Sequence, residues 1–288
     1  MAKLSARQLA EEYGFAYAFL KSDKSLWGLF KKAVSGGWSA EKFTARLKTT
    51  KWFRKNGESA RQWKLLEKSD PATAKQRFKQ TRAQVGDFAA ELGAQVSGEQ
   101  LTKLTKNALL YNWNESQLRN MLGDYVRSTH GVYTGDTGDE MDQVRKTAWA
   151  NGVRLSGTTL HNHATNIAKG KYDSDYVEGL LRRQAITLYP EYADQLKAGM
   201  DMFDIASPYR ESMAKILEMN PADIDMFDNT LRGAMQTKNE KGELTSKTLW
   251  QFEQDLRRDP RWYGTQNAQD STMAVGRQVL KDFGFMGA

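Results

Sequence analysis

Residues 22–47 have the sequence SDKSLWGLFKKAVSGGWSAEKFTARL, and the same 26-residue pattern returns without gaps at residues 97–122 and 156–181. The first position of each copy is serine and the fifth is leucine. The seventeenth position is aromatic, and the eighteenth is a residue that caps helices: Ser39, Asn114 and Asp173. Apolar residues follow at the twenty-second and twenty-sixth positions. This spacing predicts a helix pair that is used three times.

Each repeated position has a physical reason. A serine at the first position accepts a hydrogen bond from a free backbone N–H, and the leucine four residues later packs on the apolar residue before the cap. The second helix starts in the same way. The residue at position eighteen is its cap, and the aromatic residue before the cap packs on the apolar residue at position twenty-two. We therefore expect six side chains to be buried at equivalent places: Leu26, Leu101, Leu160, Phe43, Leu118 and Val177. The alternative is a coincidence of ordinary helix-capping residues.

The rest of the chain also favours helices, because proline is rare and the sequence is rich in strong helix formers. The class expected is all-α, a helical bundle that contains repeated αα-hairpins, with at most one small β-hairpin near residues 237–244. A partial fourth copy is expected at residues 244–256, with Leu249, Phe252 and Leu256 on one helix face. Further helices are expected near residues 4–20, 71–92, 138–150, 174–188, 208–219, 246–258 and 267–283. The loop at residues 128–138 is the predicted boundary between an N-terminal region, 1–127, and a C-terminal region, 139–288.

Composition excludes several kinds of chemistry. The chain has no cysteine, which rules out a disulfide framework, a thiolate metal site and a cysteine nucleophile. The first residues lack the apolar core of a secretion signal, and no apolar run is long enough to span a bilayer, so we expect no membrane span. The P-loop, dinucleotide-binding, nucleophile-elbow and zinc-protease motifs do not occur.

The remaining polar residues are weak candidates for metal binding or catalysis. His161 and His163 are two residues apart in a predicted helix, so their side chains point in different directions and cannot share an ion. His130 has no partner cluster, and the acidic run of residues 136–142 lacks the calcium-loop pattern. We expect no cofactor and no metal. Four glutamates, Glu11, Glu12, Glu91 and Glu115, are conceivable acids of a lysozyme-like enzyme, but nothing in the sequence selects one of them.

Charge is distributed unevenly along the chain, which carries a net charge of +7. Residues 41–83 hold 13 Lys/Arg against four acids, whereas residues 199–228 hold seven acids against two bases. The basic segment interleaves cations with aromatic side chains, a pattern that can neutralise phosphates and stack bases. The candidate residues for contact with nucleic acid or a partner are Lys48, Lys51, Trp52, Arg54, Lys55, Arg61 and Lys64. The alternative is that the aromatic residues belong to the core, with Lys and Arg around them.

Several strings resemble those of helical virion proteins of bacteriophages that infect actinobacteria, among them YGFAYAFLKSDKSLW, FTARLKTTKWF, ALLYNWNESQL, DIASPYRESMAKILEM and DPRWYGTQNAQDSTMAVGRQVLKDFGF. The resemblance extends from about residue 12 to residue 285. It implies an all-helical structural protein, internal or tail-associated, that acts in particle assembly or genome delivery. It implies no catalytic residues, so we expect no enzyme.

The same resemblance implies a protein made in the host bacterial cytoplasm and located in the virion. Its partners would be other virion proteins and further copies of itself, with DNA as a candidate contact. The first alternative is a nucleic-acid-binding or regulatory helical protein. The second is a muramidase-like enzyme that degrades peptidoglycan.

Overall fold

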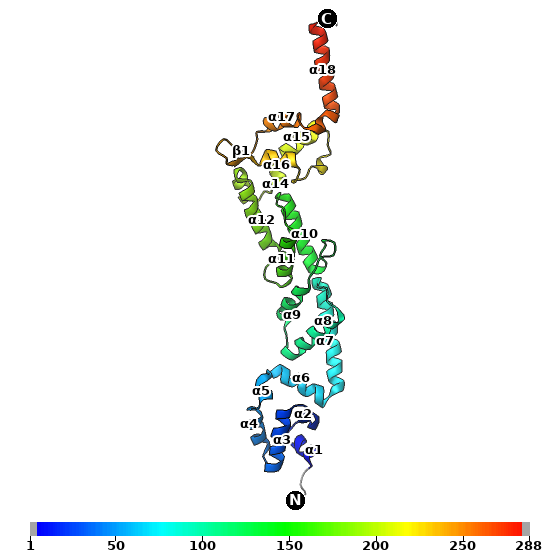
Figure 1. Cartoon of the computed structure of the whole chain (residues 1–288), viewed down its shortest axis with the longest axis vertical. Helices are drawn as coiled ribbons and strands as arrows, with labels where there is room; N and C mark the ends of the chain where they lie inside the picture. Colours follow the sequence, from blue (N-terminus) through cyan, green and yellow to red (C-terminus); the bar gives the residue numbers. More distant parts are fainter. Residues whose placement is uncertain (1–4, 284–288) are drawn as a thin grey trace. The chain divides into compact units, whose positions relative to one another are not determined.

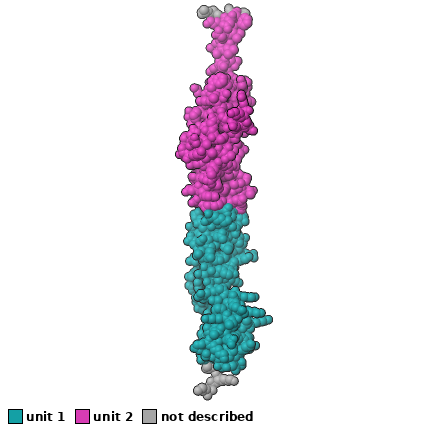
Figure 2. Space-filling view, turned by 90° about the vertical axis from the view of Figure 1, so that its left-hand side faces the viewer, with its two compact units in different colours: residues 1–139, 164–171 teal, residues 140–163, 172–288 magenta. Residues whose placement is uncertain are grey.

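The computed structural model describes residues 5–283 as an all-α fold with one two-stranded antiparallel sheet. The chain divides into two compact units. Unit 1 holds the residues up to 139 together with residues 164–171, and unit 2 holds residues 140–163 and those from 172 onward (Figure 2). The first division point falls next to the predicted boundary loop at residues 128–138.

The elements of unit 1 are, in order, α1 (Ala6–Glu12), α2 (Tyr17–Lys21), α3 (Lys24–Gly36), α4 (Ala40–Leu47), α5 (Lys51–Lys55), α6 (Glu58–Ser69), α7 (Pro71–Leu92), α8 (Gly98–Tyr111), α9 (Glu115–Leu122) and the 3-10 turn η1 (Gly123–Tyr125) (Figure 1). The helices α10 (Gly135–Ala150) and α11 (Gly157–Ala168) contribute residues to both units.

The elements of unit 2 continue with α12 (Ser174–Leu188), η2 (Pro190–Tyr192), α13 (Ala193–Lys197), α14 (Met202–Ile205), α15 (Ser207–Leu217), η3 (Pro221–Asp223), α16 (Asn229–Met235), β1 (Thr237–Lys238), β2 (Leu244–Thr245), α17 (Leu249–Leu256), η4 (Pro260–Gly264) and α18 (Gln266–Asp282). The strands β1 and β2 form the predicted small hairpin. None of the helices in residues 5–283 has the length and apolar character that crossing a bilayer would require.

The single helix predicted at residues 4–20 is wrong, because the chain turns at Gly14 and forms two shorter helices. Gly14 has a φ of +75°, and the next residue, Phe15, donates its N–H to the carbonyl of Ala10 at 2.9 Å. This left-handed glycine ends α1 in the manner of a Schellman motif. The apolar residues that suggested one long helix instead pack against α3.

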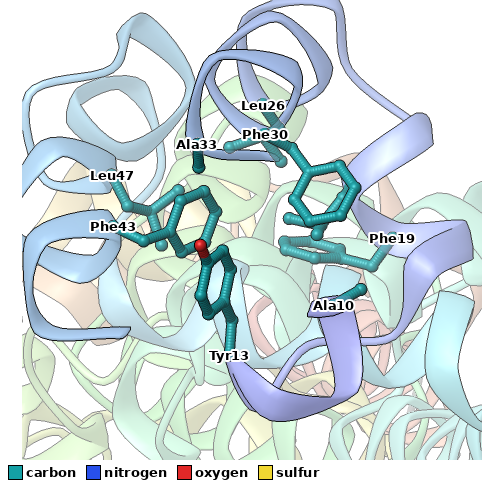
Figure 3. Close-up of a cluster of buried hydrophobic side chains, with 9 residues drawn as sticks. Ala10, Tyr13, Phe19, Leu26, Phe30, Ala33, Phe43 and Leu47 are labelled. Atoms are coloured by element: carbon teal, nitrogen blue, oxygen red, sulfur yellow. The ribbon is translucent and has the colours of Figure 1, made fainter. Parts of the chain in front are cut away.

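A dense aromatic core results from this turn (Figure 3). The ring of Tyr13 stacks on that of Phe43, with 4.6 Å between their centroids, and the edge of Phe30 approaches both rings. The Tyr13 hydroxyl donates a hydrogen bond of 2.6 Å to the carbonyl of Trp38, at the turn between α3 and α4. Burial, followed by the charge of Glu12, raises the pKa of Tyr13. The core thus joins α1 to both helices of the first pair.

The turn inside each repeated pair has the same backbone geometry. A left-handed residue ends the first helix: Gly37, Asn112 or Gly170. The residue after it donates its N–H to the carbonyl five positions earlier, as Trp38 does to Ala33 and Trp113 does to Ala108. The third copy places its left-handed residue one position earlier than the other two, so its connection contains one additional residue.

The predicted caps are confirmed at five of the six helix starts. Ser39, Ser97, Asn114, Ser156 and Asp173 each accept a hydrogen bond from the backbone N–H three residues later. The prediction for Ser22 is wrong: the cap of α3 is Asp23, whose carboxylate accepts from the N–H groups of Ser25 and Leu26. Ser22 closes α2 instead, where its hydroxyl donates to the carbonyl of Phe19. A carboxylate beside the serine takes the capping place because α3 begins one residue later than predicted.

Burial of the six predicted core residues differs among the copies. Leu26, Phe43 and Val177 are fully buried. Leu101, Leu118 and Leu160 are half-buried. In the second copy α8 packs on α6 and α7, and Leu101 lies beside Gly86 of α7. The sequence pattern therefore predicts the turn of each pair correctly and overestimates the burial of three side chains.

The turn also occurs in a fourth place that was not predicted. Glu218 is left-handed, with a φ of +52°, and Met219 donates its N–H to the carbonyl of Ala214. Asn220 then caps η3, and Ile224 is buried at the place that Leu118 has in the second copy. Of the expected partial copy at residues 244–256, Phe252 and Leu256 are buried, while Leu249 is exposed.

The last helix, α18, leaves the remainder of unit 2 after its first turn (Figure 1). The Glu218 carboxylate accepts hydrogen bonds from the backbone N–H groups of Gln266 and Asn267, at 2.9 and 2.8 Å. Ala268 is the one buried residue of this helix. The apolar side chains that follow are exposed: Met273, Val275, Val279, Leu280 and Phe283, the last at the end of the helix.

Candidate nucleic-acid interface

The predicted basic segment lies on α4, α5 and α6 of unit 1. Thr50 caps the short helix α5 by accepting from the N–H of Phe53, and Asn56 ends it. Four of the seven predicted residues are exposed: Lys48, Lys51, Arg54 and Lys55. The other three, Trp52, Arg61 and Lys64, are half-buried. The segment therefore presents most of its charge to solvent.

Four of the seven residues meet at one pocket of about 730 Å³. They come from two helices: Lys51, Trp52 and Lys55 from α5, and Lys64 from α6. The start of α3 forms another wall, with Ser22, Asp23, Lys24 and Ser25, and the last turns of α6 add Glu67 and Lys68. Five lysines and two carboxylates thus line the pocket. Lys48, Arg54 and Arg61 do not line it.

Two of the predicted cations have structural contacts. The guanidinium of Arg61 lies 3.9 Å from the centre of the Phe53 ring and donates to the carbonyls of Phe53 and Asn56. The ammonium of Lys64 donates to the side-chain oxygen of Asn56 at 2.6 Å. Both contacts hold the turn between α5 and α6 in place. Arg61 is therefore a fold-stabilising residue, whereas Lys64 both supports the turn and faces the pocket.

The two aromatic residues of α5 pack against the core of unit 1. The ring of Trp52 meets that of Phe19 edge to face, with 5.1 Å between centroids, and both Trp52 and Phe53 border the cluster of buried side chains. Trp63 on α6 is almost fully buried. Of the three rings, Trp52 alone lines the pocket, so the segment offers one partly open aromatic surface rather than a series of stacking platforms.

The electrostatics of the pocket centre on Asp23. Burial raises the pKa of its carboxyl, but hydrogen bonds from Ser25 and Leu26, together with the charge of Lys64, lower it overall. The carboxylate therefore remains ionised and directed at the N-terminus of α3, where the helix dipole also favours it. Its charge stabilises the helix start, so it offsets the surrounding lysines only in part.

Two lysines of the pocket, Lys24 and Lys68, were not among the predicted residues. Lys68 lies within the basic segment, and only the α-helical period of residues 58–69 could have placed it beside Lys64. Lys24 is distant in sequence from the segment, and its position depends on the packing of α5 on α3 and of α6 on α2. No sequence signal predicts that contact.

The other chemical candidates lie elsewhere. Glu11, Glu12, Glu91 and Glu115 are all exposed, whereas a catalytic acid of the lysozyme kind requires an apolar pocket. Within residues 5–283, no group of three or more His, Asp or Glu side chains is placed to hold a metal ion.

Residues of the histidine pair and of the acidic run form contacts within the helical framework. Nδ1 of His163 lies 3.0 Å from the hydroxyl of Tyr172, and burial lowers the pKa of the imidazole. In the acidic run, Glu140 accepts from the backbone N–H of Ser174, at the start of α12, and Asp142 pairs with Arg145. These contacts account for the side chains as parts of the helical framework.

Comparison with known proteins identifies no relative: no family model, no curated protein and no solved structure matches the chain.

Proposed function

We propose that this protein is a structural component of a bacteriophage virion, internal or tail-associated, that is present in several copies. The proposal combines the resemblance of its sequence strings with one structural observation, the uncovered apolar face of α18. YGFAYAFLKSDKSLW forms the turn from α1 to α3, and DPRWYGTQNAQDSTMAVGRQVLKDFGF contains η4 and α18.

The observation that carries the proposal is the exposure of α18. Val275 is 61% exposed and Phe283 is 74% exposed, and Val279 lies on the same side of the helix at 46%. A contiguous apolar face on an otherwise polar helix marks an association surface. A protein whose role is to join neighbours in a particle needs such a surface.

The occupant proposed for this face is a second copy of the chain, packed antiparallel. In an antiparallel register centred between Val275 and Gly276, Val275 of each copy lies opposite Gly276 of the other. The missing side chain of Gly276 leaves room for Val275, which favours close helix packing.

Mass spectrometry of purified particles, from the phage that carries this gene, tests the main proposal. We expect the protein in the particle in several copies per virion. Its absence from particles that are complete and infectious would overturn the virion assignment, whatever the chain binds in solution.

Light scattering on the purified chain tests the role of α18. We expect self-association that is lost in the variant V275S/V279S/L280S. The matched control A274S/Q278S/K281S changes the opposite face of the same helix and should associate like the unmodified chain. A monomeric unmodified chain would exclude a second copy as the occupant.

A further inference from the structure

We propose that the pocket between α3, α5 and α6 binds the phosphate backbone of a nucleic-acid strand. This inference goes beyond the virion role and does not depend on it. It starts from the charge of the pocket: five lysines, Lys24, Lys51, Lys55, Lys64 and Lys68, share one hollow of about 730 Å³ with only two carboxylates.

The protein itself neutralises the lysines only in part: of the five, Lys64 is the one whose charge acts on Asp23. Lys64 is hydrogen-bonded to Asn56, and the other four are exposed at the rim. None of the five forms an ion pair with any residue in the part of the chain that the structure describes. Asp23 is engaged with the backbone of α3, and Glu67 is exposed. Like charges held this close repel each other, and a bound anion removes that repulsion.

The extent of the basic surface favours a polymer over a small anion. A single phosphate occupies a small part of a pocket of this size and contacts two or three of its lysines. Outside the pocket, Lys48 and Arg54 remain exposed on the same segment, and Lys75 of α7 lines a neighbouring pocket together with Glu67 and Lys68. A strand with regularly spaced phosphates satisfies several of these charges at once and releases its counterions.

The chemistry of the pocket favours nucleic acid over an acidic protein. Lysine ammonium groups bind phosphate oxygens as point charges. Trp52 adds a half-buried ring at the pocket wall, fixed by its edge-to-face contact with Phe19. A strand offers phosphates to the lysines and a flat sugar–base surface to this ring. An acidic peptide offers the charges alone.

Fluorescence anisotropy of labelled single-stranded and duplex DNA with the intact chain tests the proposal over a series of salt concentrations. The variant K24Q/K51Q/K55Q/K68Q removes four pocket charges from exposed positions. We expect it to weaken DNA binding by about tenfold or more and to lower the salt slope for single-stranded DNA by up to about 3, since each lost phosphate contact lowers it by about 0.7.

The matched control is K31Q/K32Q/K103Q/K106Q, which removes the same charge from exposed positions of α3 and α8 outside the pocket. It should retain most of the affinity. An equal loss in the control, or no DNA binding by the unmodified chain at low salt, would overturn the pocket as the site. Circular dichroism of both variants verifies that their folds are unchanged.

Competition identifies the ligand class. Inorganic phosphate and a polyglutamate of the same charge as the oligonucleotide should displace labelled DNA only at much higher concentration. Displacement by polyglutamate at the same concentration as by unlabelled DNA would assign the pocket to an acidic protein and reject the nucleic-acid proposal. Displacement by free phosphate at low concentration would reject a polymer.

Discussion

The first helix pair, α3 with α4, and the second, α8 with α9, have the same turn and differ in how deeply they are packed. Both end their first helix with a left-handed residue and start their second with a polar cap. Yet Leu26 and Phe43 are fully buried, whereas their counterparts Leu101 and Leu118 are half-buried. Local hydrogen bonds therefore fix the turn, and the neighbours of each pair determine its burial. The first pair is enclosed by α1, α2 and the turn between them, whereas the second packs on α6 and α7 and is enclosed less deeply.

The largest expected difference between the two pairs comes from truncation of the counterparts Phe43 and Leu118. Phe43→Ala should lower the free energy of unfolding by about 3–5 kcal/mol, because it leaves a cavity in the aromatic core. Leu118→Ala should cost about 1–2 kcal/mol, because part of its side chain is already in contact with water. Urea denaturation followed by tryptophan fluorescence measures both. Equal losses would mean that the second pair is as tightly enclosed as the first.

The left-handed residues give the next largest effect. Gly37→Ala should cost about 1–2 kcal/mol, since a side chain is strained at a φ of +55° even though the space around it is open. Asn112→Gly in the second pair should stabilise by about 0.5 kcal/mol, because it relieves the same strain. Gly28→Ala serves as the control: this glycine lies inside α3 with open space around it, so the same substitution should be stabilising. Thermal unfolding compares the three, and a destabilising Gly28→Ala would show that helix propensity does not govern these sites.

Substitution of the helix caps in the two pairs should change the free energy of unfolding by a smaller amount. Asp23→Ala and Ser97→Ala should each cost about 1 kcal/mol, because each leaves N–H groups at a helix start without their acceptor. Ser22→Ala should change the free energy of unfolding by less than about 0.5 kcal/mol, because Ser22 caps no helix start. Urea denaturation of the three variants measures these values. A larger loss for Ser22→Ala than for Asp23→Ala would mean that α3 begins one residue earlier.

The smallest expected effect is the pH dependence of the two caps. The pKa of Asp23 is lowered in the folded state, so its ionised form stabilises the fold above its ordinary pKa. That stabilisation is lost as the pH falls through the folded pKa. The difference between the unmodified chain and Asp23→Asn should therefore shrink on acidification, while the effect of Ser97→Ala stays constant because a hydroxyl cap does not titrate. Urea midpoints at a series of pH values test both expectations.

Sequence alone predicted the elements that depend on local interactions. The serine, asparagine and aspartate caps follow from short-range hydrogen bonding, so five of the six caps were predicted correctly. The error at Ser22 arose where two adjacent residues can both cap a helix and the aligned serine was chosen. The break at Gly14 was missed because the apolar residues on both sides continue a helical pattern.

Long-range packing explains what could not be predicted. The half-buried state of Leu101 depends on how α8 packs on α6 and α7, which the pattern within residues 97–122 does not contain. The same holds for the candidate site. Lys51, Lys55 and Lys64 belong to one sequence segment, so the sequence could assign them to one site. Lys24 joins them only because α5 packs on α3 and α6 packs on α2. The assignment of Arg61 to the turn follows from its contact with Phe53, which charge patterning does not reveal.

The anchoring of α18 by Glu218 has a mechanical consequence. In the described residues this helix is joined to its unit at one end, where a single carboxylate accepts two backbone N–H groups and Asn267 donates to the carbonyl of Lys215. A load applied along the far part of the helix therefore reaches its unit through the chain at η4, the buried Ala268 and these few hydrogen bonds to α15. Glu218 and Asn267 would contribute to the force at which the helix separates from α15, which single-molecule pulling can measure.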